Sequence, residues 1–149
     1  MRTFGALLLV SLLWPSPAGA QTAADTTAIH ATVLDYVDGW WTGDVDRMER
    51  SLHPDLVKRI VVTHPGTGRS LLNSVTKSAM VEYTRAGGGS AEIEQKGKVE
   101  VELVAIEGGI ANVIATSARY LDYLHLAKWD GRWVIVNVLW AGRAPKNGT

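Results

Sequence analysis

The chain has 149 residues, carries 15 Lys and Arg against 15 Asp and Glu, and is 46% hydrophobic. This length and composition predict one globular domain and exclude collagen-like, disordered and coiled-coil architectures. A formal charge of zero without runs of like charge argues against nucleic acid as a partner. Because the chain has no cysteine, disulfides, thiolate metal sites and cysteine nucleophiles are excluded.

Residues 1–20 have the pattern of a secretory signal peptide. Met1-Arg2 gives a positive start, residues 4–14 are apolar, and Ala18-Gly19-Ala20 offers a small-residue cleavage site. The alternative is an N-terminal membrane anchor, but the apolar run is shorter than the roughly 20 residues that span a bilayer. We therefore predict a mature chain that starts at Gln21, has no membrane span and is periplasmic or secreted.

Two amphipathic helices are predicted at the start of the mature chain. Apolar residues recur at helical spacing from Ile29 to Trp40, and Gly43 ends this first helix. Asp44 then caps a short second helix, which ends at His53-Pro54 because the residue before a proline is driven out of the helical region. We expect the two helices to form a hairpin.

The middle of the chain predicts a strand, a turn and a third helix. The strand covers residues 56–62, and the Pro- and Gly-rich segment 64–68 forms the turn. The helix covers residues 74–86 and ends at Gly87-Gly88-Gly89.

Strands are predicted for the remainder of the domain, over residues 98–103, 110–129 and 133–140. The stretch 110–129 is long for one strand, so either a tight turn lies near residues 117–119 or one strongly bent strand runs through. Asp130-Gly131 is a strong hairpin signal. Helices followed by antiparallel strands predict an α+β domain over residues 21–142, with a flexible tail at 143–149.

This order of elements resembles the cone-shaped folds of the nuclear transport factor 2-like superfamily. Residues 36–44 and 52–56, and above all the run DYLHLAKWDGRWVIVN at 122–137, are similar to the putative lumazine-binding family, over about residues 28–140. The resemblance implies three N-terminal helices packed on a strongly curved antiparallel sheet. It does not fix an activity, since the superfamily includes binding modules, dimerisation domains, isomerases and dehydratases.

The resemblance to the small steroid isomerases of this superfamily implies a set of candidate catalytic residues. It places Tyr36 at the tyrosine of the first helix, His64 before Pro65 at the base, and His125 at the acid of the penultimate strand. Histidine is a competent acid or base near neutral pH. The alternatives are a core role for Tyr36 and His125, and an exposed turn position for His64.

Candidate ligand-binding residues lie on the last two predicted strands, where aromatic side chains are concentrated and the resemblance puts Trp140 at the pocket mouth. No metal site or cofactor is predicted, because the histidines lack metal-binding spacing and neither a phosphate loop nor a nucleophile elbow is present. The predicted ligand-binding residues are Tyr123, Trp129, Val136, Val138 and Trp140.

Three functions fit these observations. The leading hypothesis is an exported domain that binds a flat or hydrophobic small molecule in an apolar, aromatic-lined cone. The second is a lyase or isomerase in which His64 and His125 act as general acid and base while Tyr36 polarises a carbonyl. The third is a homodimeric interaction module that pairs through the sheet, because residues 110–115 are apolar on both sides; a homodimer is compatible with either other function.

Overall fold

A computed structural model describes the backbone of residues 18–143 and the side chains of residues 23–143. The predicted signal peptide therefore lies outside the described residues except for 18–20, and the predicted tail lies outside them except for Arg143. Among the described residues, no helix is long and apolar enough to cross a membrane.

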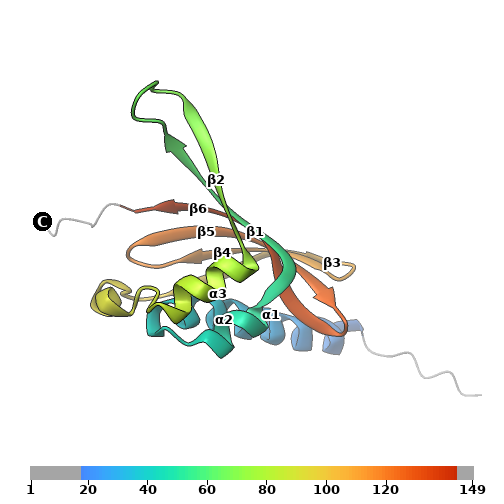
Figure 1. The fold of residues 1–149 in the computed structure, drawn as a ribbon. Helices are drawn as coiled ribbons and strands as arrows, with labels where there is room; N and C mark the ends of the chain where they lie inside the picture. Colours follow the sequence, from blue (N-terminus) through green and yellow to red (C-terminus); the bar gives the residue numbers. More distant parts are fainter. Residues whose placement is uncertain (1–17, 144–149) are drawn as a thin grey trace, which may run out of the picture.

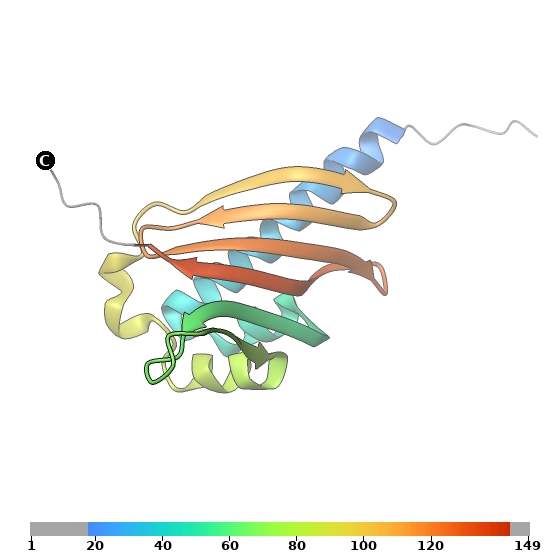
Figure 2. The ribbon, with the colours of Figure 1, turned by 90° about the horizontal axis from the view of Figure 1, so that it is seen from above.

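Helices cover one face of a single curved sheet (Figure 1). The long helix α1 (Ala18–Thr42) crosses behind the strands in Figure 2. Helix α2 (Val45–Ser51) packs against α1, and α3 (Lys77–Arg85) packs against α2. A short 3₁₀ helix, η1 (Ser90–Gln95), follows α3. The predicted α+β fold, with N-terminal helices on a strongly curved sheet, is confirmed.

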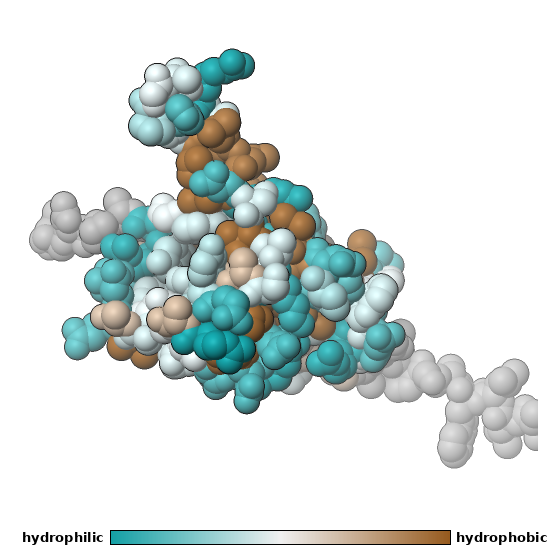
Figure 3. Space-filling model, in the orientation of Figure 1, coloured by the Kyte–Doolittle hydropathy of each residue, from teal (hydrophilic) through white to brown (hydrophobic). Residues whose placement is uncertain are grey.

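The sheet has six strands in the order β2-β1-β6-β5-β4-β3. Neighbouring strands are antiparallel except β1 and β6, which are parallel. The β1–β2 hairpin projects beyond the helices, and its base carries hydrophobic side chains (Figure 3). The strands are β1 (Leu52–Thr63), β2 (Ser70–Thr76), β3 (Glu100–Glu107), β4 (Ile110–Thr116), β5 (Tyr120–Trp129) and β6 (Arg132–Gly142).

The structure decides one open question about the strands and corrects two boundaries. The stretch 110–129 is two strands joined by a tight turn, in which the Ser117 N–H donates to the Tyr120 carbonyl at 2.9 Å. The first strand begins at Leu52, earlier than predicted. Residues 74–76 belong to β2, so α3 begins only at Lys77. Sequence patterning missed β2 because nearly all its side chains are exposed, which removes the period-two signal.

The predicted α1–α2 hairpin is formed by local chemistry. Gly43 adopts a φ of 69°, which favours glycine, and ends α1. The Asp44 side chain caps α2 by accepting a hydrogen bond from the Arg47 N–H at 3.0 Å. The Arg47 guanidinium then reaches back to Asp35 and Asp38 on α1, at 2.9 Å each, so both helices are held in one orientation.

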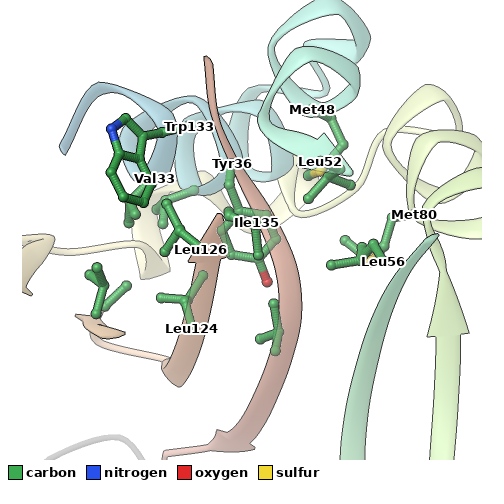
Figure 4. Close-up of a cluster of buried hydrophobic side chains, with 14 of the residues drawn as sticks. Val33, Tyr36, Met48, Leu52, Leu56, Met80, Leu124, Leu126, Trp133 and Ile135 are labelled. Carbon is green, nitrogen blue, oxygen red and sulfur yellow. The ribbon is translucent and has the colours of Figure 1, made fainter. Parts of the chain in front are cut away.

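The core lies between α1 and the inner face of the sheet (Figure 4). On β5 the inner face carries Leu124 and Leu126, which pair with buried residues of β4. A register shift follows on β6, where His125 pairs with Asn137 but Leu126 pairs with Ile135, so Val136 is a bulge residue. The bulge changes which residues of β6 face inward: Trp133, Ile135, Val138 and Trp140 belong to the core or pack against it.

Candidate functional site

A cavity of about 200 Å³ lies between the helices and the inner face of the sheet. Aromatic and aliphatic side chains form most of its wall, and a smaller number of polar side chains complete it. Its composition is that of a small-molecule site, which is mostly apolar with a few placed polar groups. The lining residues are Tyr36, Val37, Trp40, Trp41, Lys58, Ile60, Val75, Met80, Tyr83, Val99, Ala115, Thr116, Ser117, Tyr120, Asp122 and Trp140.

Three polar side chains from three different elements meet on the wall of the cavity. The Tyr36 hydroxyl donates to Asp122 Oδ1 at 3.0 Å, and Lys58 Nζ donates to the same oxygen at 2.8 Å. Lys58 Nζ also donates to the Tyr36 hydroxyl oxygen. Only 13% of the Lys58 side chain and 8% of the Asp122 side chain are exposed, so this is a buried, mutually hydrogen-bonded group.

Burial shifts the pKa values of two of these groups, Tyr36 and Lys58, away from their usual values. Desolvation, followed by the nearby Asp122 charge, raises the pKa of Tyr36 well above its usual value of 10.0, so the phenol stays protonated. Desolvation lowers the pKa of Lys58 below 10.5, although the Asp122 carboxylate opposes this change. The site therefore holds a phenol that keeps its proton and an amine that gives up its proton more readily than an exposed lysine.

Two aromatic rings lie next to the Lys58 ammonium. It lies 4.8 Å from the ring centroid of Trp140 and 5.1 Å from that of Tyr36, both cation–π distances. Tyr120 makes an edge contact with Trp140 at 5.5 Å and a tilted contact with Trp41 at 5.6 Å. These contacts fix the ring orientations, so the aromatic wall is built before any ligand enters.

Two glycines that follow α3 pack against tryptophans of the cavity wall. Gly88 has a φ of 53°, and a Cβ there would lie 2.4 Å from the Trp40 carbonyl oxygen. At Gly89 a Cβ would lie 2.8 Å from both the Trp40 and the Trp41 rings. The chain can pass this close to both cavity tryptophans because Gly88 and Gly89 have no Cβ atom.

The structure does not bring the two candidate histidines to the cavity. His64 lies at the exposed tip of the β1–β2 hairpin, where its Nδ1 accepts from the Gly66 N–H at 3.2 Å. His125 is exposed on the outer face of β5, 3.4 Å from the Asn137 amide. Of the three residues predicted to meet, only Tyr36 lines the cavity. The prediction of their convergence is corrected: Lys58 and Asp122 take the positions next to the phenol.

Side-chain alternation explains this correction. On β5 the buried residues are Asp122, Leu124 and Leu126, so His125 faces away from the core. The sequence contained this signal, because the two leucines mark the inner face. On β1, Lys58 shares a face with buried Leu56 and is therefore turned inward. Counting alternate residues from Leu124 on β5 predicts that Asp122 faces inward, and counting from Leu56 on β1 predicts the same for Lys58.

The predicted ligand-binding residues are spread over several environments. Trp140 lines the cavity, while Val138 is buried in the core and Val136 is the bulge residue of β6. Tyr123 is half exposed on the outer face. Trp129, also half exposed, lies against His53 at the far end of β5 from the cavity, with ring centroids 4.7 Å apart. The described residues include no cluster of His, Asp or Glu suited to a metal ion.

A comparison with known protein families identifies the family of this chain. A family profile described as putative lumazine-binding matches residues 24–141, a range that includes every side chain of the cavity wall and all of the helices and strands except the first turns of α1 and the last residue of β6. The chain belongs to this family. No curated protein matches it.

Solved structures of low sequence identity share the nuclear transport factor 2-like fold of this chain. One of unknown function from Silicibacter pomeroyi has 20% identity and a TM-score of 0.59, covering 82% of this chain and 98% of its own. A ketosteroid isomerase-like protein from Erwinia carotovora has 16% identity and a TM-score of 0.51, with coverages of 80% and 96%. A putative dehydratase from Streptomyces avermitilis has 12% identity and a TM-score of 0.51, with coverages of 83% and 99%. At these identities the likeness shows the fold alone.

Proposed function

We propose that this protein binds a flat, largely apolar small molecule in its aromatic cavity. The observation that carries the proposal is the combination of a preformed aromatic wall with one buried polar group of Tyr36, Lys58 and Asp122. Apolar walls favour a planar hydrophobic body through burial and stacking. The polar group selects for a ligand that carries a hydrogen-bond acceptor at one end.

Lys58 is the anchor for that acceptor. An ammonium has three N–H donors, and Asp122 and Tyr36 take two of them. Within the part of the chain that the structure describes, the remaining N–H has no acceptor. A ligand carbonyl or hydroxyl oxygen next to Lys58 would satisfy it, and in this low-dielectric site such a bond discriminates strongly against ligands without an acceptor.

The proposal is tested by calorimetric titration with 2-naphthalenemethanol, a flat probe with one hydroxyl group. We expect Trp140→Ala to weaken binding at least about tenfold, the effect of losing a stacked aromatic contact. Trp129→Ala is the matched control, because Trp129 is half exposed at the opposite end of the sheet, and should bind as the wild type does. Equal affinity in all three proteins, or no binding to the wild type, would refute the cavity as the site.

A second candidate function is general acid–base catalysis by a lyase or isomerase. It is favoured by the meeting of an amine, a carboxylate and a phenol within hydrogen-bonding distance on the wall of a largely apolar cavity. Lys58 and Asp122 would act in place of the two histidines. The test is turnover of enolisable ketones, where Lys58→Met should lower the rate at least about a hundredfold while His125→Ala leaves it unchanged.

The protein is further proposed to be a homodimer that pairs through the outer face of the sheet. Ile114, Tyr123 and Leu139 are directly opposite one another on β4, β5 and β6, and the last two are 50% and 45% exposed. Arg59 continues this row on β1 next to Leu139. A row that is apolar at its centre suits self-association about a two-fold axis.

Light scattering across a wide concentration range tests the dimer. We expect a dimer mass for the wild type and a monomer mass for Leu139→Asp, because a charge at the centre of an apolar interface is costly. Val104→Asp is the control: Val104 is at least as exposed as Leu139 but lies on the edge strand β3, so this variant should remain dimeric. A wild type that is monomeric at every concentration refutes the pairing.

Export to the periplasm or beyond is proposed from residues 1–20 alone. Cleavage after Ala20 would leave a mature chain that starts at Gln21. N-terminal sequencing of the protein recovered from the periplasmic fraction of a bacterial host tests this proposal. Recovery of the uncleaved chain in the cytoplasm would contradict it.

A further inference from the structure

We infer that Lys58 is a carbonyl-reactive amine, which condenses with an aldehyde or ketone group of the ligand to form an imine in the cavity. The inference rests on the proposed binding site and names the reactive group of its ligand. It does not follow from binding alone, since a lysine can serve as a charge without reacting.

The geometry around Lys58 is that of an activated nucleophile. An activated nucleophile has a base within hydrogen-bonding reach, and that base is oriented by a third group. Here the base is the Asp122 carboxylate, 2.8 Å from Nζ, and the third group is the Tyr36 hydroxyl, 3.0 Å from the same oxygen. Lys58 also lines the cavity, so a ligand carbon can approach the nitrogen.

Proton movements within this group complete the reaction. Lys58 gives one ammonium proton to Asp122, and the neutral amine attacks the carbonyl carbon to form the C–N bond. Tyr36 protonates the carbonyl oxygen and is reprotonated by Asp122, which then takes a second proton from the nitrogen. That proton returns through Tyr36 to the hydroxyl group, which leaves as water while the C=N bond forms.

The atoms and charges of this reaction balance. One ammonium and one carbonyl group yield one protonated imine and one water, with no change in oxidation state. The protonated imine keeps the positive charge next to Asp122, so the buried ion pair survives the reaction. Burial supports the first step, because desolvation lowers the pKa of Lys58 and makes the neutral amine more accessible.

The experiment traps the imine with sodium cyanoborohydride in the presence of 2-naphthaldehyde, a flat apolar aldehyde. We expect one naphthylmethyl group per chain by intact mass, located on Lys58 by peptide mapping. Lys98 is the internal control, because its side chain is 83% exposed and lies outside the cavity wall. Labelling of Lys58 should be at least about tenfold faster than that of Lys98, the advantage of a positioned reaction partner.

Two variants separate imine formation by Lys58 from the effect of its positive charge. Lys58→Arg keeps a cation next to Asp122 but cannot form an imine, so the rapid label should vanish while the slow label on Lys98 persists. Asp122→Asn removes the base and should slow labelling of Lys58 at least about tenfold. Because the comparison of Lys58 with Lys98 is made within the wild-type chain, it does not depend on how either variant folds.

The outcomes distinguish this inference from the proposed function. If 2-naphthalenemethanol binds but Lys58 is labelled no faster than Lys98, the inference is wrong and the binding function stands. If the alcohol does not bind and Lys58 is not labelled, both are wrong. Binding of the alcohol together with rapid labelling confined to Lys58 supports both.

Discussion

A single carboxylate oxygen of Asp122 accepts hydrogen bonds from both the Tyr36 hydroxyl and the Lys58 ammonium. The three residues come from α1, β1 and β5, so one buried oxygen ties the first helix to two strands of the sheet. Stability and ligand chemistry therefore depend on the same atoms, and the two contributions need separate tests.

Replacing Asp122 with Asn should destabilise the protein by about 3–5 kcal/mol, because Lys58 is left as a buried charge without its counter-charge. Adding Lys58→Met to this variant should recover much of the loss, since the unpaired charge is then gone. Chemical denaturation of the wild type, both single variants and the double variant measures the coupling. Strict additivity of the two single effects would show that the pair is not energetically coupled.

Alkaline conditions should destabilise the protein through Tyr36. Its folded-state pKa lies above the unfolded value of 10.0, so above that pH the unfolded chain releases a proton that the folded chain retains. The free energy of unfolding then falls by up to about 1.4 kcal/mol for each pH unit. Tyr36→Phe should remove this part of the loss, which is measured by urea unfolding of both proteins between about pH 8 and pH 11. If the free energy of unfolding depends on pH in the same way in the wild type and in Tyr36→Phe, a buried phenol that keeps its proton is contradicted.

Lys58 should act on stability in the opposite sense as the pH rises. Its folded-state pKa lies below 10.5, so between the two pKa values the folded chain has released a proton that the unfolded chain still binds. The free energy of unfolding therefore rises with pH in that window, until Tyr36 reverses the trend. In Lys58→Met the rise should be absent. A rise of equal size in this variant would assign the effect to another group.

Gly88→Ala should be far more costly than an equivalent change at Gly68. Both glycines have a positive φ, 53° and 67°, but a Cβ at Gly88 meets the Trp40 carbonyl oxygen while a Cβ at Gly68 meets nothing within 4 Å. We expect a loss of about 1–2 kcal/mol at Gly68 from backbone strain alone. The loss at Gly88 should exceed about 3 kcal/mol, because the clash with backbone is added to that strain. Thermal unfolding compares the two variants, and similar losses would show that the chain moves away from Trp40 at little cost.

His64→Ala and His125→Ala should each bind 2-naphthalenemethanol within about twofold of the wild type, the usual range for residues that do not touch the ligand. Neither histidine lies on the cavity wall, because one is at the hairpin tip and the other is on the outer face. Calorimetric titration of both variants checks this. A marked loss in either would mean that the hairpin or the outer face takes part in binding.

Local chemistry made several elements predictable. Gly43 followed by Asp44 separates α1 from α2 as expected, since a positive φ and a helix cap are properties of single residues. The Asp130-Gly131 hairpin is likewise formed by two residues with positive φ, 48° and 78°. Strand β2 and the exact start of α3 were not predictable in this way, because exposed strand residues leave no hydrophobic period to read.

The sequence by itself determined the fold class, the helical hairpin, the turn chemistry and an aromatic-rich C-terminal sheet, because these follow from neighbouring residues and from a resemblance carried by short motifs. Only the tertiary structure decided that Lys58 meets Asp122, which is 64 positions away along the chain. That meeting depends on strand register, on the bulge at Val136 and on which alternate residues of β1 and β5 face inward. A shift of one residue in either strand would turn the side chain to the opposite face, so the site exists only once the whole sheet has formed.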